Sequence, residues 1–226
     1  MSGFGPRELL SLYASGVFPM AESKQAQDVF IVDPDKRGII PLDGLHISKS
    51  LAKTVRSGRF HIRINTAFPD VVKACAAKRP DQEDTWINGT IFDLYLQIHD
   101  LGYAHSVECW QEEQLVGGLY GVHLGQAFFG ESMFSRQRDA SKVALVHLVG
   151  RLKAGGFKLL DTQFLTDHLA RLGAIEISRA QYHTKLEAAL QQQASFYPKN
   201  FDDSTYSRSV VPTSRKLPTQ SSTQIS

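Results

Sequence analysis

The sequence predicts an α+β domain over residues 44–203, in which helices flank a mixed β-sheet. The chain has 226 residues, 42% of them hydrophobic, which is enough to bury a large core. Its predicted elements follow the order helix, three antiparallel strands, long helix, strand, short helix, strand, which is typical of this class. We expect a small N-terminal subdomain at residues 1–43 and a disordered tail at residues 204–226.

The N-terminal segment combines a short helix with extended structure. Residues 9–13 indicate a helix, and Pro19 prevents its continuation because a proline disfavours helical backbone at the residue before it. A strand, a turn and further extended chain follow at residues 30–32, 33–38 and 39–40. We place the subdomain boundary near residues 42–44.

Two capped helices open the main domain. Ser48 is a suitable N-cap for a helix that ends at Arg56, before Gly58. Asn88 is a suitable N-cap for a helix that ends at Asp100. Between them we expect a strand, a helix and a charged loop at residues 60–65, 69–77 and 78–83.

The second half of the domain alternates strands and helices. Three antiparallel strands are predicted at residues 104–110, 114–124 and 126–130. The helix predicted at residues 140–153 is apolar almost all round, so it should be largely buried. Residues 157–163 are mostly apolar as far as Asp161, which predicts a strand inside the sheet. A short helix, a strand and a last helix follow at residues 166–172, 174–177 and 179–191.

Composition excludes several classes of protein. No uncharged apolar run approaches the roughly 18 residues needed to cross a bilayer, so we expect no membrane association. Two cysteines, Cys75 and Cys109, encode neither a disulfide framework nor a zinc cluster. The N-terminus has no export pattern, so we expect a cytoplasmic protein.

Charge is segregated along the chain. Residues 1–203 hold 22 basic and 23 acidic side chains, yet residues 44–69 contain cations and no acid. These cations are Lys49, Lys53, Arg56, Arg59 and Arg63. The first three fall on one face of the predicted helix, where they could attract an anionic partner. The commoner meaning of such a run, an ordinary solvated helix face, stays open.

Several motifs, in order along the chain, resemble those of the bacterial leucyl/phenylalanyl-tRNA–protein transferases. The most specific is GESMFS at residues 130–135, followed by ASK at residues 140–142. The others are GVFP at 16–19, LHIS at 45–48, TWI at 85–87, HSVE at 105–108, LVGGLYG at 115–121, LDTQ at 160–163 and LGA at 172–174. The resemblance runs from about Tyr13 to about Tyr182 and so covers most of the chain.

This resemblance implies an enzyme that moves Leu or Phe from an aminoacyl-tRNA to the N-terminal amine of proteins beginning with Lys or Arg, tagging them for degradation. It also implies an N-acetyltransferase-like (GNAT-like) fold, which the order of elements favours as well. Acetyltransferases cradle acetyl-CoA in a glycine-rich loop before the long helix. Here residues 131–140 contain no glycine, and Glu131 would repel a diphosphate, so either this fold has lost coenzyme A or the fold is a different one. The resemblance implies an enzyme that uses no acetyl-CoA, in agreement with the missing loop, so we expect no cofactor. The alternatives are a coenzyme-A-dependent N-acetyltransferase and a non-catalytic tRNA-binding module.

Three side chains are candidates for catalysis. The amine that attacks the ester must lose a proton, and the oxyanion that forms must be stabilised. Asp161 and Gln163 lie at i and i+2 of a predicted strand and point the same way. The resemblance implies that Asp161 holds the amine, that Gln163 positions it or the ester, and that Glu131 binds the free α-ammonium of the aminoacyl group. The alternatives are a loop cap for Asp161 and a salt bridge from Glu131 to Arg136 or Arg138.

The resemblance also implies binding sites for the aminoacyl-adenosine. A pocket for the Leu or Phe side chain would be formed by Leu119, Phe128, Met133, Leu145 and Leu148, which the sequence alone would place in the core. Trp86 matches a tryptophan on which the terminal adenosine stacks, a contact worth about 1–3 kcal/mol; the alternative is a core tryptophan. Met20 stands where the family often has a second tryptophan.

The remaining expectations concern partners. By resemblance, the tRNA backbone would be contacted by Lys49, Lys53, Arg56, Arg59 and Arg63. None of the eight histidines forms a metal-ligand cluster, and His168 reads as a helix-start residue, so we assign no metal. The expected partners are Leu- or Phe-tRNA and protein substrates, and the expected state is a monomer.

Overall fold

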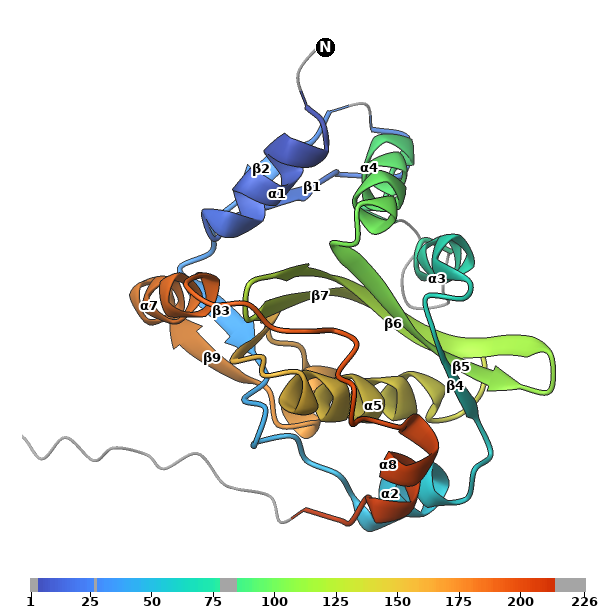
Figure 1. Ribbon diagram of the computed structural model, residues 1–226. Helices are drawn as coiled ribbons and strands as arrows, with labels where there is room; N and C mark the ends of the chain where they lie inside the picture. The colour runs from blue at the N-terminus through green and yellow to red at the C-terminus, as the bar shows by residue number, and fades with distance from the viewer. Residues whose placement is uncertain (1–3, 27, 78–84, 214–226) are drawn as a thin grey trace, which may run out of the picture.

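The computed structural model describes residues 4–26, 28–77 and 85–213, and its centre is a seven-stranded sheet between two layers of helices (Figure 1). The strand order is β4-β5-β6-β7-β8-β3-β9. Helices α1, α3, α4 and α7 cover one face, and α5, with α2 and α8 beside it, covers the other (Figure 1). The α+β class with a mixed sheet is therefore confirmed.

The strands are antiparallel to their neighbours except at one place. Strands β7 and β8 run parallel. The strands of the large sheet are β3 (Lys36–Ile39), β4 (His61–Ile64), β5 (Ala104–Gln111), β6 (Gln114–Leu124), β7 (Ala127–Ser135), β8 (Leu159–Gln163) and β9 (Ile175–Ser178). A separate antiparallel pair is formed by β1 (Phe18–Met20) and β2 (Phe30–Val32).

Two of the helices begin at the N-caps that the sequence predicts. The Ser48 side chain accepts a hydrogen bond from the Leu51 N–H (3.1 Å), and the Asn88 side chain accepts one from the Ile91 N–H (2.8 Å). The helices are α1 (Pro6–Ala14), α2 (Lys49–Arg56), α3 (Phe68–Cys75), α4 (Gly89–Asp100), α5 (Ala140–Ala154), α6 (Asp167–Arg171), α7 (Arg179–Leu190) and α8 (Asp203–Ser209). Among the described residues, none of these helices combines the length and apolar character needed to cross a bilayer.

The turn predicted at residues 33–38 is wrong in its second half. Residues 36–39 form β3, which lies between β8 and β9 in the large sheet. Two consecutive charged residues, Lys36 and Arg37, are typical of an exposed turn. Here they lie in a strand, and Arg37 is buried against an internal carboxylate. The division at residue 43 stays a prediction, although β3, which precedes it, belongs to the large sheet.

The expectation of a disordered tail is wrong for residues 204–213. Helix α8 begins after the N-cap Asp202 and packs on α5, where the Tyr206 ring fills the space beside Gly150. Val210 is 5% exposed, and its carbonyl accepts a hydrogen bond from Arg56 (2.8 Å). A few apolar contacts and one capped turn therefore order a polar segment. The rest of the predicted tail and the loop predicted at residues 78–83 lie outside the described residues.

Strand β7 is longer than predicted and carries a bulge. It pairs with β6 as far as Ser135, and because Tyr120 pairs with Ser132 while Gly121 pairs with Gly130, Glu131 is an extra residue in the strand. The parallel ladder between β7 and β8 ends at Phe129 and Asp161. Beyond this point the two strands separate, which opens the sheet beside Glu131.

Candidate functional site

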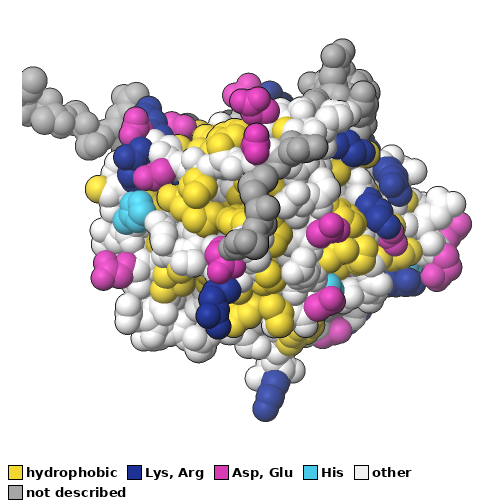
Figure 2. All heavy atoms as spheres, turned by 90° about the horizontal axis from the view of Figure 1, so that it is seen from above, with side chains coloured by type: hydrophobic (Ala, Val, Ile, Leu, Met, Phe, Trp, Pro, Cys, Tyr) yellow, Lys and Arg dark blue, Asp and Glu magenta, His cyan; other side chains and the backbone are white. Residues whose placement is uncertain are grey.

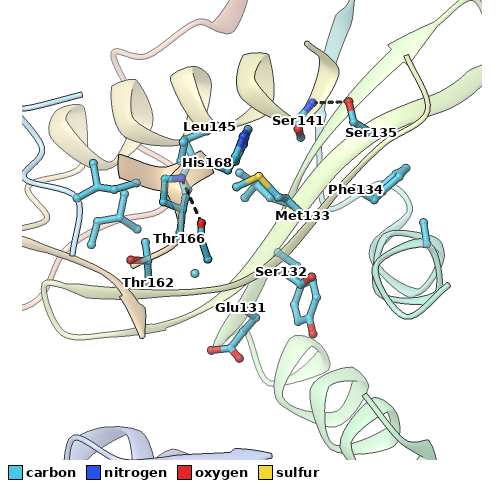
Figure 3. A pocket seen from close by; sticks show the side chains of 18 of the residues that line it. Glu131, Ser132, Met133, Phe134, Ser135, Ser141, Leu145, Thr162, Thr166 and His168 are labelled. Atoms are coloured by element: carbon cyan, nitrogen blue, oxygen red, sulfur yellow. Dashed lines mark hydrogen bonds between the residues drawn. The ribbon is translucent and has the colours of Figure 1, made fainter. Parts of the chain in front are cut away.

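A cavity of about 820 Å³ lies where β7 and β8 separate. Its walls come from β6, β7, β8, the first half of α5, α6 and the end of α3. Figure 3 shows Glu131 toward one end of the cavity and the Ser135–Ser141 pair toward the other, with Met133 between them. The volume is within the range of small-molecule sites.

Four of the five predicted pocket residues line this cavity: Leu119, Met133, Leu145 and Leu148. Phe128 does not. Its side chain is fully buried and stacks on Phe196, with ring centroids 5.6 Å apart. Phe128 precedes the bulge, where β7 is still paired with β8, so the sheet leaves no opening at its position.

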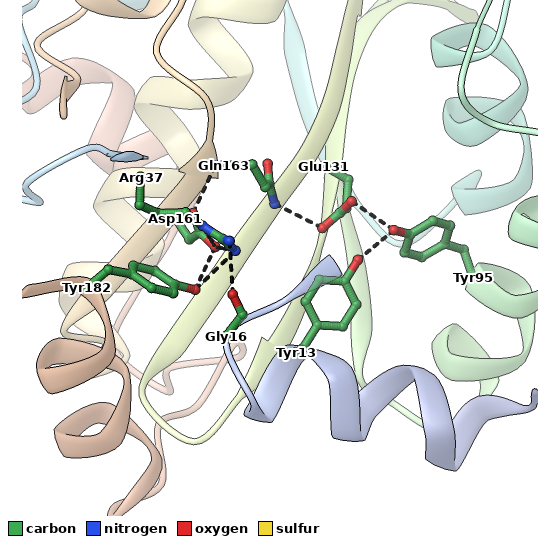
Figure 4. A network of polar contacts seen from close by, with 8 residues as sticks. All are labelled: Tyr13, Gly16, Arg37, Tyr95, Glu131, Asp161, Gln163 and Tyr182. Carbon is green, nitrogen blue, oxygen red and sulfur yellow. Dashed lines mark hydrogen bonds and ion pairs between the residues drawn. The ribbon is translucent and has the colours of Figure 1, made fainter. Parts of the chain in front are cut away.

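The Glu131 carboxylate is held by neutral groups. It accepts hydrogen bonds from the Tyr95 hydroxyl (2.8 Å) and from the Gln163 amide nitrogen (3.2 Å), and the Tyr95 hydroxyl in turn bonds the Tyr13 hydroxyl (2.6 Å) (Figure 4). Neither predicted salt-bridge partner takes part. Arg136 donates to the Leu115 carbonyl, and Arg138 pairs with Asp139.

This environment raises the pKa of Glu131 to about 7. The largest cause is burial, which disfavours the charged form, and hydrogen bonds from Tyr95 and Tyr13 oppose it. Burial also raises the pKa of Tyr95 and Tyr13 well above the usual range, so both hydroxyls remain donors. Glu131 is therefore a carboxylate without a cationic hydrogen-bond partner, at the edge of a mostly apolar cavity.

Gln163 connects Glu131 to Asp161. Its side-chain nitrogen donates to Glu131, and its backbone N–H donates to the Asp161 carboxylate (2.8 Å) (Figure 4). Its backbone is left-handed, with φ +56°, a conformation that costs a non-glycine residue free energy. Because the amide nitrogen faces Glu131, the Gln163 side-chain oxygen is the atom available to accept a hydrogen bond from a substrate.

Asp161 is enclosed. It is 0% exposed, and Arg37 forms a fork of hydrogen bonds to it, Nε to Oδ1 (2.9 Å) and Nη2 to Oδ2 (2.6 Å). The Tyr182 hydroxyl donates to the same carboxylate (2.8 Å). With the Gln163 N–H added, its lone pairs are largely occupied. The predicted loop-cap contact is thus present, within a larger network.

Arg37 is itself fully buried. It donates to the Gly16 carbonyl (2.9 Å) and lies over the rings of Phe18 and Tyr182, 4.6 and 4.3 Å from their centroids. Burial alone would lower the pKa of the guanidinium, but hydrogen bonds to Asp161 and the charge of that residue leave the pKa raised. The GVFP motif at residues 16–19 therefore encloses the partner of Asp161.

Two buried hydroxyls line the cavity without a hydrogen-bond partner among the described residues. They belong to Tyr120 and Thr162. Burial raises the pKa of Tyr120 well above its usual range, so its hydroxyl is a donor. Unsatisfied buried polar atoms are uncommon, and these two could bind polar atoms of a substrate.

The two predicted adenosine contacts lie outside the cavity wall. Trp86 is half-buried and packs edge-on against Tyr95, 6.5 Å between centroids. Met20 is half-buried and packs against the same hydrophobic cluster. Trp86 thus touches the network that holds Glu131 through Tyr95.

The five basic residues between positions 49 and 63 form two groups, those without and those with a hydrogen-bond or ion-pair partner among the described residues. Lys49 and Lys53 are exposed on α2, without an ion pair or hydrogen bond to any described residue. Arg56 binds the Val210 carbonyl, Arg59 binds Gln137 (3.1 Å), and Arg63 pairs with Glu113 (3.2 Å). Arg56 and Arg59 are also exposed and bind neutral groups, so they keep their charge, and among the described residues only Arg63 of the five is paired with an acid.

Figure 2 views the face covered by α1 and α4, where cations and acids are interspersed among exposed apolar patches. Phe30 and Ile31 of β2 are among the exposed apolar side chains of the described residues. Within the described parts of the chain, no group of three or more His, Cys, Asp or Glu residues could hold a metal ion.

Sequence reasoning missed Arg37, Tyr182 and Tyr13. Arg37 was hidden in a turn-like pattern, and nothing in a single sequence distinguishes a buried arginine from an exposed one. Tyr95 gave a usable signal, since it falls at helical spacing on the same face as the apolar residues Ile91, Leu94 and Ile98. A buried tyrosine hydroxyl requires a partner.

Comparison with known proteins gives one consistent result. A family model described as leucyl/phenylalanyl-tRNA protein transferase matches residues 39–187. A leucyl/phenylalanyl-tRNA–protein transferase of Phenylobacterium zucineum is 61% identical over 197 residues, which cover 87% of this chain and 89% of the relative. One from Rhodospirillum rubrum is 55% identical over 196 residues, covering 87% and 92%. Among solved structures, that of L-PGS from Bacillus licheniformis has a TM-score of 0.39 at 14% identity, covering 73% of this chain and 55% of that chain, which is too low to support an argument.

Proposed function

The chain belongs to the leucyl/phenylalanyl-tRNA–protein transferase family, and from this premise we propose that it moves Leu or Phe from an aminoacyl-tRNA to the N-terminal amine of proteins that begin with Lys or Arg. The modification would tag these proteins for degradation. We propose in addition a GNAT-like fold, a monomeric state and a cytoplasmic location.

The observation that carries the proposal is the pairing of a deep apolar cavity with Glu131. A Leu or Phe side chain would fill the space lined by Leu119, Met133, Leu145 and Leu148. The free α-ammonium of the same aminoacyl group would then meet the Glu131 carboxylate, which has no cationic hydrogen-bond partner of its own. An acyl group without an amine would leave this carboxylate unpaired.

The reaction requires one new C–N bond and the loss of one C–O bond. The neutral N-terminal amine attacks the ester carbonyl, and the tetrahedral intermediate collapses with departure of the ribose 3′-oxygen, which takes up a proton as the amine loses one. The Gln163 side-chain oxygen would accept a hydrogen bond from the amine and aim its lone pair at the carbonyl. The Tyr120 and Thr162 hydroxyls are available to stabilise the oxyanion.

We assign Asp161 an indirect role. Its carboxylate is enclosed by Arg37, Tyr182 and the Gln163 N–H, so in this conformation an incoming amine has no access to it. Its hydrogen bond to the Gln163 backbone instead supports the left-handed conformation that points the Gln163 side chain at Glu131. Asp161 is thus a positioning residue, and Gln163 and Glu131 are the groups that meet the substrates.

The tRNA would approach from two sides of the cavity. Trp86 offers a ring for the terminal adenosine beside Tyr95, and Met20 adds an apolar surface to that cluster. Lys49 and Lys53, free on α2, would contact backbone phosphates. Arg56 and Arg59 are exposed and hydrogen-bonded to neutral groups, so they could do so as well, whereas Arg63 would first have to leave Glu113.

A transfer assay with three donors tests the proposed function. Labelled Leu-tRNA, Phe-tRNA and acetyl-CoA are each mixed with the protein and a peptide that begins with Arg. We expect label from the two aminoacyl-tRNAs on the peptide, none from acetyl-CoA, and none on a peptide whose N-terminal amine is acetylated. Transfer from acetyl-CoA alone would show an acetyltransferase, and tRNA binding without transfer would show a non-catalytic binding module.

A further inference from the structure

A second cavity, about 370 Å³ in volume, lies between the N-termini of α2 and α5 and the helix α6. It adjoins the first cavity, because His168 lines both. We call it the α2–α6 cavity. None of the residues assigned to the transfer reaction lines it.

Positive charge converges on the α2–α6 cavity. Arg138, Lys142 and Arg171 line it, and Asp139 is the acid among its lining residues. Asp139 pairs with Lys142 (2.9 Å) and with Arg138 (3.7 Å), whereas Arg171 has no ion pair or hydrogen bond to a described residue. The cavity therefore keeps an excess of positive charge after its internal pairs are formed.

Neutral donors surround these cations. Ser48 and Ser50 line the cavity at the start of α2, where the first backbone N–H groups of a helix have no intrahelical acceptor. The Nδ1 atom of His46 is buried without a partner among the described residues, and His46 also lines the cavity. Convergent cations, two hydroxyls and a helix N-terminus suit an anion with several acceptor oxygens, and the His46 ring can donate to it in its Nδ1–H tautomer.

The pKa of His168 reflects the positive charge around the α2–α6 cavity. Burial lowers its pKa, and the charges of Lys142 and Arg171 lower it further. Lys49 and Ser50 are adjacent in α2, so the α2–α6 cavity continues the surface that carries the free cations Lys49 and Lys53. An RNA phosphate backbone lying along α2 would pass its mouth.

We propose that the α2–α6 cavity is a phosphodiester site that holds a backbone phosphate of the donor tRNA, a proposal that rests on the proposed function. Arg171 binds the phosphate directly, and Arg138 and Lys142 bind it by exchanging part of their contact with Asp139. The site fixes the position of the acceptor arm relative to the first cavity, in which the aminoacyl group is held.

Equilibrium binding of uncharged fluorescent tRNA tests the proposal over a series of salt concentrations. The variant Arg138→Gln/Arg171→Gln should bind roughly tenfold more weakly than wild type at low salt, as expected for lost charged hydrogen bonds. The slope of log K against log salt should flatten by about 0.7 for a single-stranded contact or about 0.9 for a duplex contact. Both side chains are exposed, so the fold should survive, which thermal unfolding checks.

The control variant is Lys158→Gln, which removes one exposed cation just before β8, at the opposite end of the strand from the site. It should bind tRNA as wild type does, with the same salt slope. A wild-type slope in Arg138→Gln/Arg171→Gln would overturn the proposal. A wild-type protein that binds this tRNA but transfers nothing would contradict the proposed function and leave the phosphate site standing.

NMR of His168 distinguishes tRNA from free phosphate as the occupant. An anion beside Lys142 and Arg171 should raise the pKa of His168 from its lowered value. We expect saturating tRNA to cause this shift in wild type and to cause a smaller one in Arg138→Gln/Arg171→Gln. A shift with inorganic phosphate and none with tRNA would overturn the assignment to RNA.

Discussion

Replacing Arg37 with methionine is expected to lower the free energy of unfolding by about 3–5 kcal/mol, measured by urea denaturation at pH 7. The substitution removes the fork of hydrogen bonds to Asp161 and leaves a 0% exposed carboxylate without its cation. Two hydrogen-bonded neighbours, the Tyr182 hydroxyl and the Gln163 N–H, remain, but neither carries charge.

Two further variants separate charge from packing. Arg37→Lys keeps the positive charge but cannot form the fork, so it should fall between wild type and Arg37→Met. The double variant Arg37→Met/Asp161→Asn removes both charges and should recover part of the lost stability. If Arg37→Met were as stable as wild type, the buried pair would not hold this end of the sheet together.

Replacing Gln163 with alanine is expected to lower the turnover number for transfer by roughly 10²–10³-fold, the usual effect of losing a preorganised group at the reacting centre. The dissociation constant of the aminoacyl-tRNA should change far less, because Gln163 contacts neither the proposed adenosine surface nor the basic face. Single-turnover transfer and equilibrium binding measure the two quantities separately.

Backbone strain must be separated from loss of the amide. Residue 163 has φ +56°, which alanine tolerates poorly and glycine tolerates well. Gln163→Gly should therefore show the same loss of turnover with less loss of stability. Gln163→Asn suits the backbone but is one methylene short of Glu131, so it should also be slow. Equal losses of binding and turnover in Gln163→Gly would remove Gln163 from the reacting centre.

Local sequence signals predicted most of the secondary structure. Ser48 and Asn88 cap α2 and α4 as expected, and most of the apolar segment 157–163 forms the interior strand β8. These features depend on caps and periodicity within a few residues of the element concerned. The tail 204–213 was missed because its order comes from contacts with α2 and α5, far away in the sequence.

The site was predictable only in part. Motifs identified Glu131, Asp161 and Gln163, and four of the five apolar residues predicted to form the pocket do line the cavity. The bulge at Glu131 was not predicted, although it separates Phe128, in the core, from Met133, in the cavity wall. The enclosure of Asp161 was not predicted either. It depends on the buried Arg37, which reaches Asp161 only because β3 enters the sheet beside β8.

The central claim is that the first cavity holds an aminoacyl group by its side chain and that Glu131 holds its α-ammonium. Calorimetry with a phenylalanyl-adenosine joined through a 3′-amide tests this claim most directly. Two forms of this ligand, one with a free α-amine and one with an acetylated α-amine, are titrated into the wild-type protein and into Glu131→Gln. In wild type the free amine should bind at least roughly tenfold more tightly, as a charged hydrogen bond allows. Since the pKa of Glu131 is about 7, and a bound ammonium lowers it, binding near pH 7 should also release protons. Glu131→Gln should bind the two ligands almost equally and release no protons at this site. The same preference for the free amine in both proteins, with no proton release from wild type, would contradict the account.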